Sequence, residues 1–339
     1  MKASVCMITY NHEKYIAQAI ESVIMQKTDL DYELVIGEDC STDRTRDICK
    51  SYKEKYPKKI KLLLQERNLG IIPNFIQTLR ACDGEYIAML EGDDYWTDPY
   101  KLQKQATFLD ANPDYGLVHS DFDHWEEKSS EYIKAFNKTF YRTVPQGYVY
   151  EELLRRNFIN TLTVCFRREL ISNFFAKELV LFKNSLIGDN CIWLEIARKK
   201  KIAYIDEPMA TYRELISSAS HYKDNNKRLK FFKSAYGIRF YFIKKYGCSE
   251  STKSIVLENY HSGLLKIYSN SGNRKRAKTS YDHLIKKCHI GSSIIYSIYL
   301  FGAYNIITLF VSKIILKFID LSANFLINLN LIKKQSSRF

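Results

Sequence analysis

The chain has 339 residues, a formal net charge of +13 and a hydrophobic fraction of 46%. This composition is that of a globular protein, and it excludes a disordered chain, a collagen or a coiled coil. The charge is unevenly distributed, because residues 1–208 hold 29 Lys and Arg against 32 Asp and Glu, whereas residues 209–339 hold 22 against 6. The first two thirds are therefore treated as a separate unit. No nucleic-acid partner is expected, because the excess charge lies among apolar residues rather than beside a base-stacking platform.

The eight cysteines indicate the redox environment. No two of them form a C-x-x-C pair, and several, including Cys6, Cys82 and Cys165, lie within apolar runs. This pattern favours reduced, buried thiols in a cytosolic protein over a disulfide framework. The N-terminus begins with a strand-like run and lacks the basic and apolar segments of a signal peptide, so we expect no secretion.

Strand and helix patterns alternate through the first 111 residues. The periodicity of apolar residues predicts helices at about 15–24, 41–56, 73–82 and 99–111, with Ser41 and Asp98 as N-caps, and strands at 4–10, 33–38, 60–65 and 86–90. This alternation predicts an α/β fold with a mostly parallel sheet flanked by helices. Ligands of such sheets bind outside the carboxyl ends of the strands. The segments after Tyr10, Glu38 and Leu90 should therefore converge on one crevice.

The rest of the chain divides into two parts. Mixed patterns continue to residue 208, with helices near 150–156 and 189–200 and strands at 115–122, 161–166 and 202–205. All six prolines lie at or before Pro208, and the chain beyond it reads as helical and basic. We therefore predict one domain over residues 1–215 and a helical, basic C-terminal region over residues 216–339.

One segment of the C-terminal region suggests contact with a membrane. No residue between Lys287 and Lys313 is formally charged, and basic residues flank this stretch on both sides. The stretch is long enough to span a bilayer, but it carries many polar side chains. A helix lying in an anionic membrane surface fits this pattern best. A membrane-spanning helix, or a helix packed on the domain or on a partner, remains an alternative.

An acidic motif follows the fourth predicted strand directly, in the run Leu90-Glu91-Gly92-Asp93-Asp94-Tyr95-Trp96. In an extended chain Glu91 and Asp93 face one side and Asp94 the other. Two carboxylates on one face of a crevice suit Mg²⁺ or Mn²⁺, and Gly92 would let a ligand approach the backbone. The alternative is an acidic turn that caps the following helix.

Two further strand ends carry polar side chains. Asp39 follows the second strand, and its carboxylate, which only accepts hydrogen bonds, suits the ring N–H of a uracil. Thr9, Tyr10 and Asn11 end the first strand, where Tyr10 could stack on a base and Asn11 could start the helix. A simple strand-to-helix turn at Asp39 and a buried tyrosine at position 10 are the alternatives.

Several common catalytic motifs are absent from the sequence. The chain has no G-x-G-x-x-G after the first strand, no G-x-x-x-x-G-K-[ST], no G-x-S-x-G and no H-E-x-x-H. This argues against a dinucleotide oxidoreductase, a P-loop nucleotidase, an α/β-hydrolase and a zinc protease.

Together the three strand ends resemble the family 2 glycosyltransferases, which have the GT-A fold. That family has T/S-Y-N, then D-D-x-S-x-D-x-T, then L-D-x-D-D-x-W-x-P-x-K-L. This chain has Thr9-Tyr10-Asn11, then Glu38-Asp39-Cys40-Ser41-Thr42-Asp43-Arg44-Thr45, then Leu90-Glu91-Gly92-Asp93-Asp94-Tyr95-Trp96-Thr97-Asp98-Pro99-Tyr100-Lys101-Leu102. The resemblance covers about residues 3–215. Glu38 and Glu91 depart from the family's usual Asp but keep the charge.

The resemblance implies a role for each motif. Asp39 would bind the uracil of a UDP-sugar with Tyr10 against the base, and Thr9, Asn11 and Asn68 would belong to the same nucleotide-sugar site. Asp93, with help from Glu91, would hold Mn²⁺ or Mg²⁺ on the diphosphate. Asp189, in Gly188-Asp189-Asn190, matches the family's catalytic carboxylate, although plain helix capping is its alternative. The loop after the last strand would offer Arg213 or His221 to the diphosphate.

These roles imply a metal-dependent, inverting glycosyltransferase. It would move a sugar from a nucleotide-sugar, UDP-linked by preference, to a hydroxyl of a glycan or lipid-linked glycan in the synthesis of a cell-surface polysaccharide or glycolipid. The C-terminal region would hold it at the cytoplasmic face of the membrane as a peripheral protein. A sugar nucleotidyltransferase and a non-catalytic scaffold of a polysaccharide-assembly complex are the alternatives.

Overall fold

The computed structural model describes residues 1–141, 143–172, 174, 188–216, 224–287, 294–303, 312 and 315–316. The chain groups into two compact units. Unit 1 comprises residues 1–221 and 237–247, and unit 2 comprises residues 222–236 and 248–339. The division after residue 215 stays a prediction, because spatial grouping alone does not show which part folds independently.

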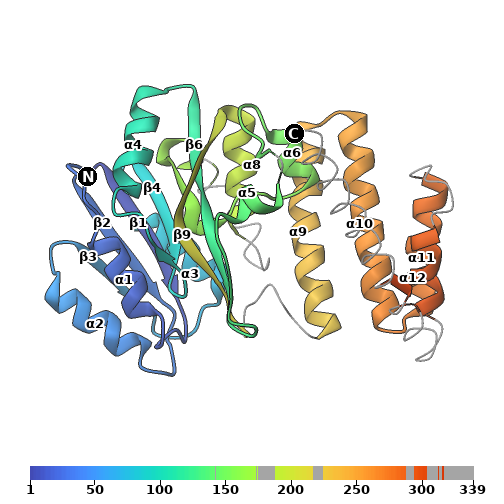
Figure 1. Ribbon diagram of the computed structural model, residues 1–339, viewed down its shortest axis with the longest axis horizontal. Helices are drawn as coiled ribbons and strands as arrows, with labels where there is room; N and C mark the ends of the chain where they lie inside the picture. The colour runs from blue at the N-terminus through green and yellow to red at the C-terminus, as the bar shows by residue number, and fades with distance from the viewer. Residues whose placement is uncertain are drawn as a thin grey trace, which may run out of the picture. The chain divides into compact units, whose positions relative to one another are not determined.

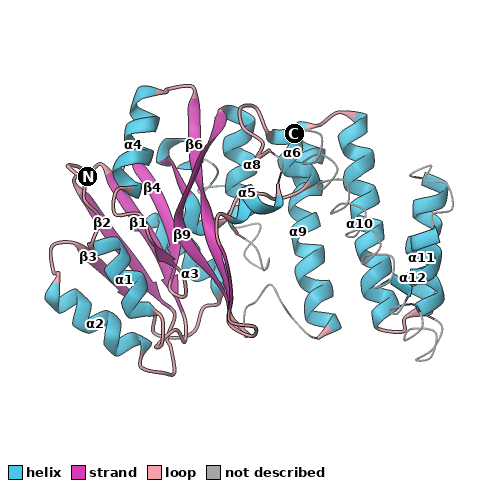
Figure 2. Ribbon diagram, in the orientation of Figure 1, coloured by secondary structure: helices cyan, strands magenta, loops and turns pink. Residues whose placement is uncertain are grey.

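Strands and helices alternate through the first part of unit 1 (Figures 1 and 2). The strands are β1 (Ala3–Thr9), β2 (Tyr32–Glu38), β3 (Ile60–Leu64), β4 (Tyr86–Glu91), β5 (Tyr95–Trp96), β6 (Tyr115–Glu126), β7 (Glu131–Ile133), β8 (Val164–Arg167) and β9 (Lys201–Glu214). The helices are α1 (Ile16–Ile24), α2 (Thr45–Lys55), α3 (Ile71–Arg80), α4 (Lys101–Ala111), α5 (Phe136–Phe140), α6 (Tyr150–Arg155) and α8 (Asp189–Lys199), with 3₁₀ turns η1 (Thr161–Thr163) and η2 (Arg168–Ile171).

All the strands belong to one sheet. Its order is β3-β2-β1-β4-β8-β6-β9-β5, with β7 paired to β6. The pairs β3–β2, β2–β1, β1–β4 and β6–β9 are parallel, whereas β8 runs antiparallel to β4 and β6, and β5 runs antiparallel to β9. The predicted α/β fold with a mostly parallel sheet and flanking helices is therefore confirmed.

Helices cover both faces of the sheet, as a parallel sheet requires. Leu34 and Ile36 of β2 pack into a core that includes side chains of α1, α2 and α4. Gly37 faces the other way, and a Cβ there would lie 1.8 Å from the hydroxyl of Thr78 on α3. Phe166 of β8 packs against Trp193 of α8, with ring centroids 5.9 Å apart.

Two helices begin later than the sequence predicts. The expected N-cap at Ser41 is wrong, because α2 begins at Thr45 and the Ser41 hydroxyl instead accepts a hydrogen bond from the Asn11 backbone. The expected cap at Asp98 is also wrong, because α4 begins at Lys101. The Asp98 carboxylate accepts from the Tyr100 backbone and pairs with Lys104. Ser41 therefore bonds to the loop after β1, whereas Asp98 bonds to Tyr100 just before α4 and to Lys104 within it.

Two strands run further than the sequence predicts. β6 reaches Glu126 and β9 reaches Glu214, whereas the apolar runs predict ends at residues 122 and 205. The two strands pair in parallel along this extension, with register shifts between Ser120 and Asp123. Backbone pairing, rather than apolar alternation, therefore sets their length. As a result Arg213 lies in a strand, not in the loop that the sequence predicts.

Unit 2 contains the predicted C-terminal helices. They are α10 (Glu250–Asn270), α11 (Arg274–Lys287), α12 (Ile294–Gly302) and residues 225–236 of α9 (Asn225–Tyr246). Their core consists of Leu264, Leu265, Tyr268, Ala277, Leu284 and Ala303. No helix within the described residues combines the length and the apolarity that a membrane span needs. Most of the uncharged segment, at 288–293 and 304–311, lies outside those residues.

Lys101 is the most unusual core residue of unit 1. Its side chain is fully buried, its Nζ donates to Gln105 Oε1 at 2.7 Å, and it lies 4.3 Å above the ring of Trp96. Burial lowers its pKa to about 7, because the interior penalises the ammonium form. Trp96 is itself buried, with its indole N–H bonded to the Leu162 carbonyl, so it is a packing residue.

Lys101 should make the stability of the protein depend on pH. Above pH 7 the folded chain loses this proton while the unfolded chain, with an ordinary lysine pKa of 10.5, keeps it. The unfolded state then binds more protons, so stability rises with pH by up to about 1.4 kcal/mol per unit from this group. We predict that the free energy of unfolding of the wild type, minus that of Lys101→Met, increases by about 1–2 kcal/mol between pH 7 and pH 8.5. Urea unfolding at both pH values measures it, and a difference independent of pH would contradict it.

Candidate active site

The ends of three neighbouring strands form the floor of the site. β1 pairs in parallel with β2, placing Thr9 opposite Glu38, and with β4, placing Ile8 opposite Glu91. The residues that follow these strands therefore lie at one edge of the sheet. This edge is where ligands bind in open α/β sheets.

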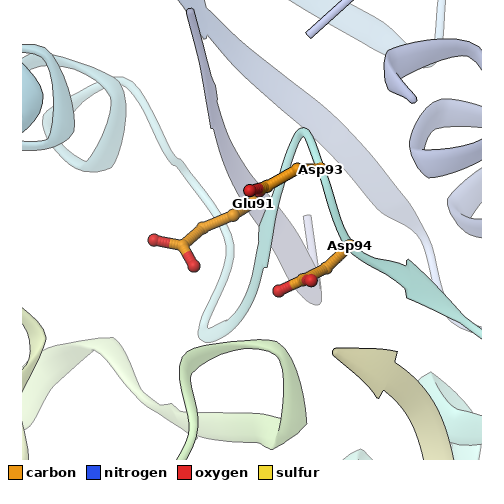
Figure 3. A group of neighbouring side chains, drawn as sticks. All are labelled: Glu91, Asp93 and Asp94. Carbon is orange, nitrogen blue, oxygen red and sulfur yellow. The ribbon is translucent and has the colours of Figure 1, made fainter. Parts of the chain in front are cut away.

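The acidic motif forms a compact group of carboxylates at this edge. Glu91, Asp93 and Asp94 can each offer an oxygen within 4.8 Å of the others. Figure 3 shows the three side chains pointing to the same side of the loop after β4. The expectation that Asp94 faces away is wrong, because β4 ends at Glu91 and the chain turns there, with the Asp94 N–H donating to the Glu91 carbonyl.

Mutual repulsion and burial perturb these carboxyl groups. Burial, with the charges of Asp93 and Asp189 adding to it, raises the pKa of Glu91 to about 8. Burial and the charges of Asp93 and Glu91 also raise the pKa of Asp94. Asp94 Oδ2 is buried and has no hydrogen-bond partner among the described residues. Crowded carboxylates with an unpartnered oxygen are a donor set that fits a hard divalent cation.

Arg213 of β9 holds the acidic loop in place. Its backbone N–H donates to Asp94 Oδ1 at 2.8 Å, and its guanidinium donates to the Asp93 carbonyl at 2.6 Å and to Gln18. The guanidinium also lies 4.3 Å above the ring of Tyr95. Arg213, which the sequence assigns to a diphosphate, thus binds the protein's own loop. His221, the other residue in that assignment, lies outside the described residues.

The loop after β1 contacts both neighbouring loops. Asn11 has a positive φ of 57°, and its side-chain oxygen accepts from the Thr42 N–H at 2.8 Å. Thr9 is buried, with its hydroxyl 3.3 Å from His12 Nδ1. The Tyr10 side chain is 41% exposed, so the reading of a buried tyrosine is wrong and the ring is free to stack on a ligand.

No sequence motif indicated His12, and Gly92 has a different role from the one expected. His12 Nε2 lies 3.9 Å from Asp93 Oδ2, and only its position just after the Thr9–Asn11 motif could have indicated this. A Cβ on Gly92 would lie 2.5 Å from the Thr9 hydroxyl and 3.0 Å from His12 Nδ1. The space above Gly92 is therefore filled by the loop after β1. Gly92 lets that loop approach, rather than a ligand.

Asp39 faces the turn at residues 68–70. Its two oxygens accept from the backbone N–H groups of Leu69, at 2.7 Å, and Gly70, at 2.9 Å. Burial, partly offset by these two bonds, raises the pKa of Asp39. Asn68, in the same turn, is exposed. A carboxylate has about four lone-pair positions, so both Asp39 oxygens keep capacity for another donor.

Glu38 is a structural residue. Its side chain is fully buried, pairs with Arg46 and accepts from the Ser41 N–H at 2.6 Å. It therefore holds the turn after β2 and does not join the acidic group after β4.

Asp189 begins α8. Its Oδ2 accepts from the Thr161 hydroxyl at 3.0 Å and its Oδ1 accepts from the Asn190 N–H at 2.7 Å. Burial raises its pKa. Because its charge contributes to the raised pKa of Glu91, Asp189 lies within electrostatic range of the acidic group.

Comparison with known proteins identifies the family. A model of glycosyl transferase family 2 matches residues 4–175, which is just over half of the chain. This chain belongs to glycosyltransferase family 2.

Curated relatives match this chain at modest identity, and some of them over only part of their own length. An uncharacterised protein of Mycobacterium bovis is 33% identical over 232 residues, and the match covers 66% of this chain but only 62% of that protein. TuaG of Bacillus subtilis, whose name provisionally assigns it to teichuronic acid biosynthesis as a glycosyltransferase, is 29% identical over 72% of this chain and 92% of its own length.

Solved structures share the GT-A glycosyltransferase fold. Staphylococcus aureus TarS, residues 1–349, in complex with UDP-GlcNAc has a TM-score of 0.53 at 18% identity, covering 89% of this chain and 79% of that chain. The mannosyltransferase PcManGT of Pyrobaculum calidifontis, in complex with GDP-Man and Mn²⁺, has a TM-score of 0.54 at 16% identity, covering 92% and 86%. At these identities the likeness shows the fold alone.

The acidic group gives a prediction about stability with and without metal. Asp93→Asn should raise the melting temperature in a chelator by about 2–4 °C, because it relieves repulsion. The same change should remove the rise in melting temperature that Mn²⁺ gives the wild type. Scanning fluorimetry at pH 7, with EDTA or with Mn²⁺, measures both effects.

Asp83→Asn is the matched control, because the Asp83 side chain is 67% exposed and pairs with Lys61 away from the acidic group. It should keep the Mn²⁺ response of the wild type. A full Mn²⁺ response in Asp93→Asn would contradict the prediction.

Proposed function

We propose that this chain is an inverting glycosyltransferase that uses a divalent cation, Mn²⁺ or Mg²⁺, to transfer a sugar from a UDP-sugar to an acceptor hydroxyl. The observation that carries the proposal is the convergence of Glu91, Asp93 and Asp94 within electrostatic range of Asp189. Glu91 and Asp93 suit a cation bound to a diphosphate, and Asp189 suits a proton acceptor.

The donor would lie across the ends of β1, β2 and β4. Asp39 would accept the imide N–H of uracil, and the exposed ring of Tyr10 would stack on the base. Thr9, Asn11 and Asn68 would shape the loops around the nucleotide. Glu91 and Asp93 would hold the cation, which when bound offsets the negative charge that develops on the departing diphosphate.

Asp189 would act as the general base. The Thr161 hydroxyl and the Asn190 N–H orient its carboxylate. Its raised pKa makes it a better proton acceptor than an ordinary aspartate, provided that it stays ionised at the working pH. The acceptor oxygen would attack the anomeric carbon on the face opposite the diphosphate, and Asp189 would take the hydroxyl proton as the new bond forms. This geometry inverts the anomeric configuration.

We expect Asp189→Asn to bind the donor and Mn²⁺ with unchanged affinity and to lower the transfer rate by about 10²- to 10⁴-fold, because only proton transfer is lost. Calorimetry with UDP-, GDP- and dTDP-sugars measures donor binding, and release of the nucleoside diphosphate measures transfer.

Asp114→Asn serves as the control, since its exposed carboxylate pairs with Lys201. It should retain full activity. Wild-type turnover in Asp189→Asn would remove Asp189 from the proposed role. Release of pyrophosphate from a nucleoside triphosphate and a sugar phosphate would favour a nucleotidyltransferase instead.

The acceptor proposed is a lipid-linked glycan in the synthesis of a cell-surface polysaccharide or glycolipid. The name of TuaG supports a polysaccharide role. The basic start of α11 supports a position against the anionic cytoplasmic face of a membrane, since its exposed cations are Arg274, Lys275, Arg276 and Lys278.

Replacing these four α11 cations with glutamine should release the protein from vesicles that contain phosphatidylserine, because each cation near such a surface adds about 1 kcal/mol. Flotation of the full chain with anionic and with neutral vesicles measures this. The control replaces four exposed cations of unit 1, namely Lys50, Lys55, Lys58 and Arg80. Equal binding by both variants, or no binding by the wild type, would contradict the membrane role.

A further inference from the structure

A cavity of about 280 Å³ lies in unit 1 between the extended parts of β6 and β9, helix α5 and residues 157–160. Its walls include Phe122 and His124 of β6, Phe136 of α5, Asn157, Asn160 and Glu214 of β9. We call it the His124 cavity. Asn157 at its rim is exposed, so the cavity is open to solvent.

The walls alternate aromatic rings with hydrogen-bonding groups. The rings of Phe122 and Phe136 lie 5.1 Å apart, and the ring of His124 lies 5.3 Å from that of Phe136. Asn157, Asn160 and Glu214 also line the cavity, and the Asn157 amide bonds to the backbone of Ile159. Apolar faces beside a few placed polar groups are typical of a small-molecule site. They match a pyranose, which has a C–H face and a rim of hydroxyls.

His124 and Glu214 give the cavity a defined polarity. His124 Nε2 lies 3.0 Å from Glu214 Oε2. Because a carboxylate only accepts, Nε2 carries the hydrogen of this bond. Nδ1 is buried and has no hydrogen-bond partner among the described residues.

Neighbouring residues of the chain relate the cavity to Asp189, the proposed general base. Asn160 lines the cavity, and the next residue, Thr161, donates its hydroxyl to Asp189. The cavity wall therefore adjoins, in the chain, the residue that orients the proposed general base. The donor loops after β1, β2 and β4 contribute no residue to the described walls. This separates the cavity from the donor site.

We propose that the His124 cavity binds the terminal sugar of the acceptor and that this sugar is a neutral pyranose. The assignment rests on the proposed function and adds a substrate class to it. The volume suits a single ring. The carboxylate of Glu214 on the wall repels an anion, so the cavity discriminates against a uronic acid or a sugar phosphate.

Binding of methyl glycosides tests the proposal without any turnover. The probes are methyl glucoside, methyl galactoside, methyl N-acetylglucosaminide and methyl glucuronide. Saturation-transfer NMR measures their binding with and without UDP and Mn²⁺. We expect at least one neutral glycoside to bind the wild type at least 10-fold more tightly than the glucuronide. Phe136→Ala should weaken that binding by at least 10-fold.

Tyr148→Ala is the matched control, because the Tyr148 side chain is 74% exposed and does not line the cavity. It should bind like the wild type. Glu214→Gln keeps the shape of the side chain and removes its charge, so the neutral glycoside should bind this variant less than 3-fold more tightly than the glucuronide does. Because glucuronide then binds more tightly than it binds the wild type, this result cannot come from an unfolded variant.

The proposal is overturned if no neutral glycoside binds under any of these conditions, if Phe136→Ala binds as well as Tyr148→Ala, or if glucuronide binds the wild type as tightly as the neutral probes. Binding of UDP and Mn²⁺ is recorded in the same samples. If the nucleotide binds but the glycosides fail these criteria, the acceptor assignment falls and the donor assignment stands. If the nucleotide fails to bind while the glycosides meet the criteria, the proposed function falls and the cavity remains a sugar site.

Discussion

The repulsion among carboxylates at the end of β4 is the constraint on which the rest of the site depends. Glu91, Asp93 and Asp94 crowd within 4.8 Å, and the charge of Asp189 adds to their field. Such a group is unfavourable unless a cation or protons offset it. Arg213 stabilises this arrangement, because its backbone N–H bonds to Asp94 and its guanidinium bonds to the Asp93 carbonyl. The loop after β1 closes over Gly92 and fixes the turn from the other side.

The proposed site has two halves, and Asp189 is related to each of them. The loops after β1, β2 and β4 form the half proposed for the donor. The extensions of β6 and β9 form the half proposed for the acceptor. Asp189 relates to both, because it bonds to Thr161 beside the His124 cavity and its charge acts on Glu91. A proton acceptor between a donor and an acceptor is the arrangement that a direct displacement needs.

The strand ends could be predicted from the sequence, but the contacts between segments far apart in the chain could not. Asp39 and Asp93 could be found because each follows an apolar run, and parallel strands bring their carboxyl ends together. The side to which the Asp94 side chain points could not be predicted, because side chains stop alternating between the two faces of the strand where the chain turns at Glu91. Arg213 could not be assigned to the acidic loop, because it lies 120 residues from Asp93 and in a strand extended by backbone pairing. The N-caps were misplaced for a related reason, since the Ser41 hydroxyl serves a loop 30 residues away.

The most direct test of the account is a crystal structure of the full chain with Mn²⁺ and UDP, in which anomalous scattering locates the metal. The account predicts a Mn²⁺ peak within about 2.5 Å of carboxylate oxygens of Asp93 or Glu91, with the diphosphate of UDP on the same ion. A nucleotide bound without metal, or a Mn²⁺ ion bound away from the end of β4, would contradict it.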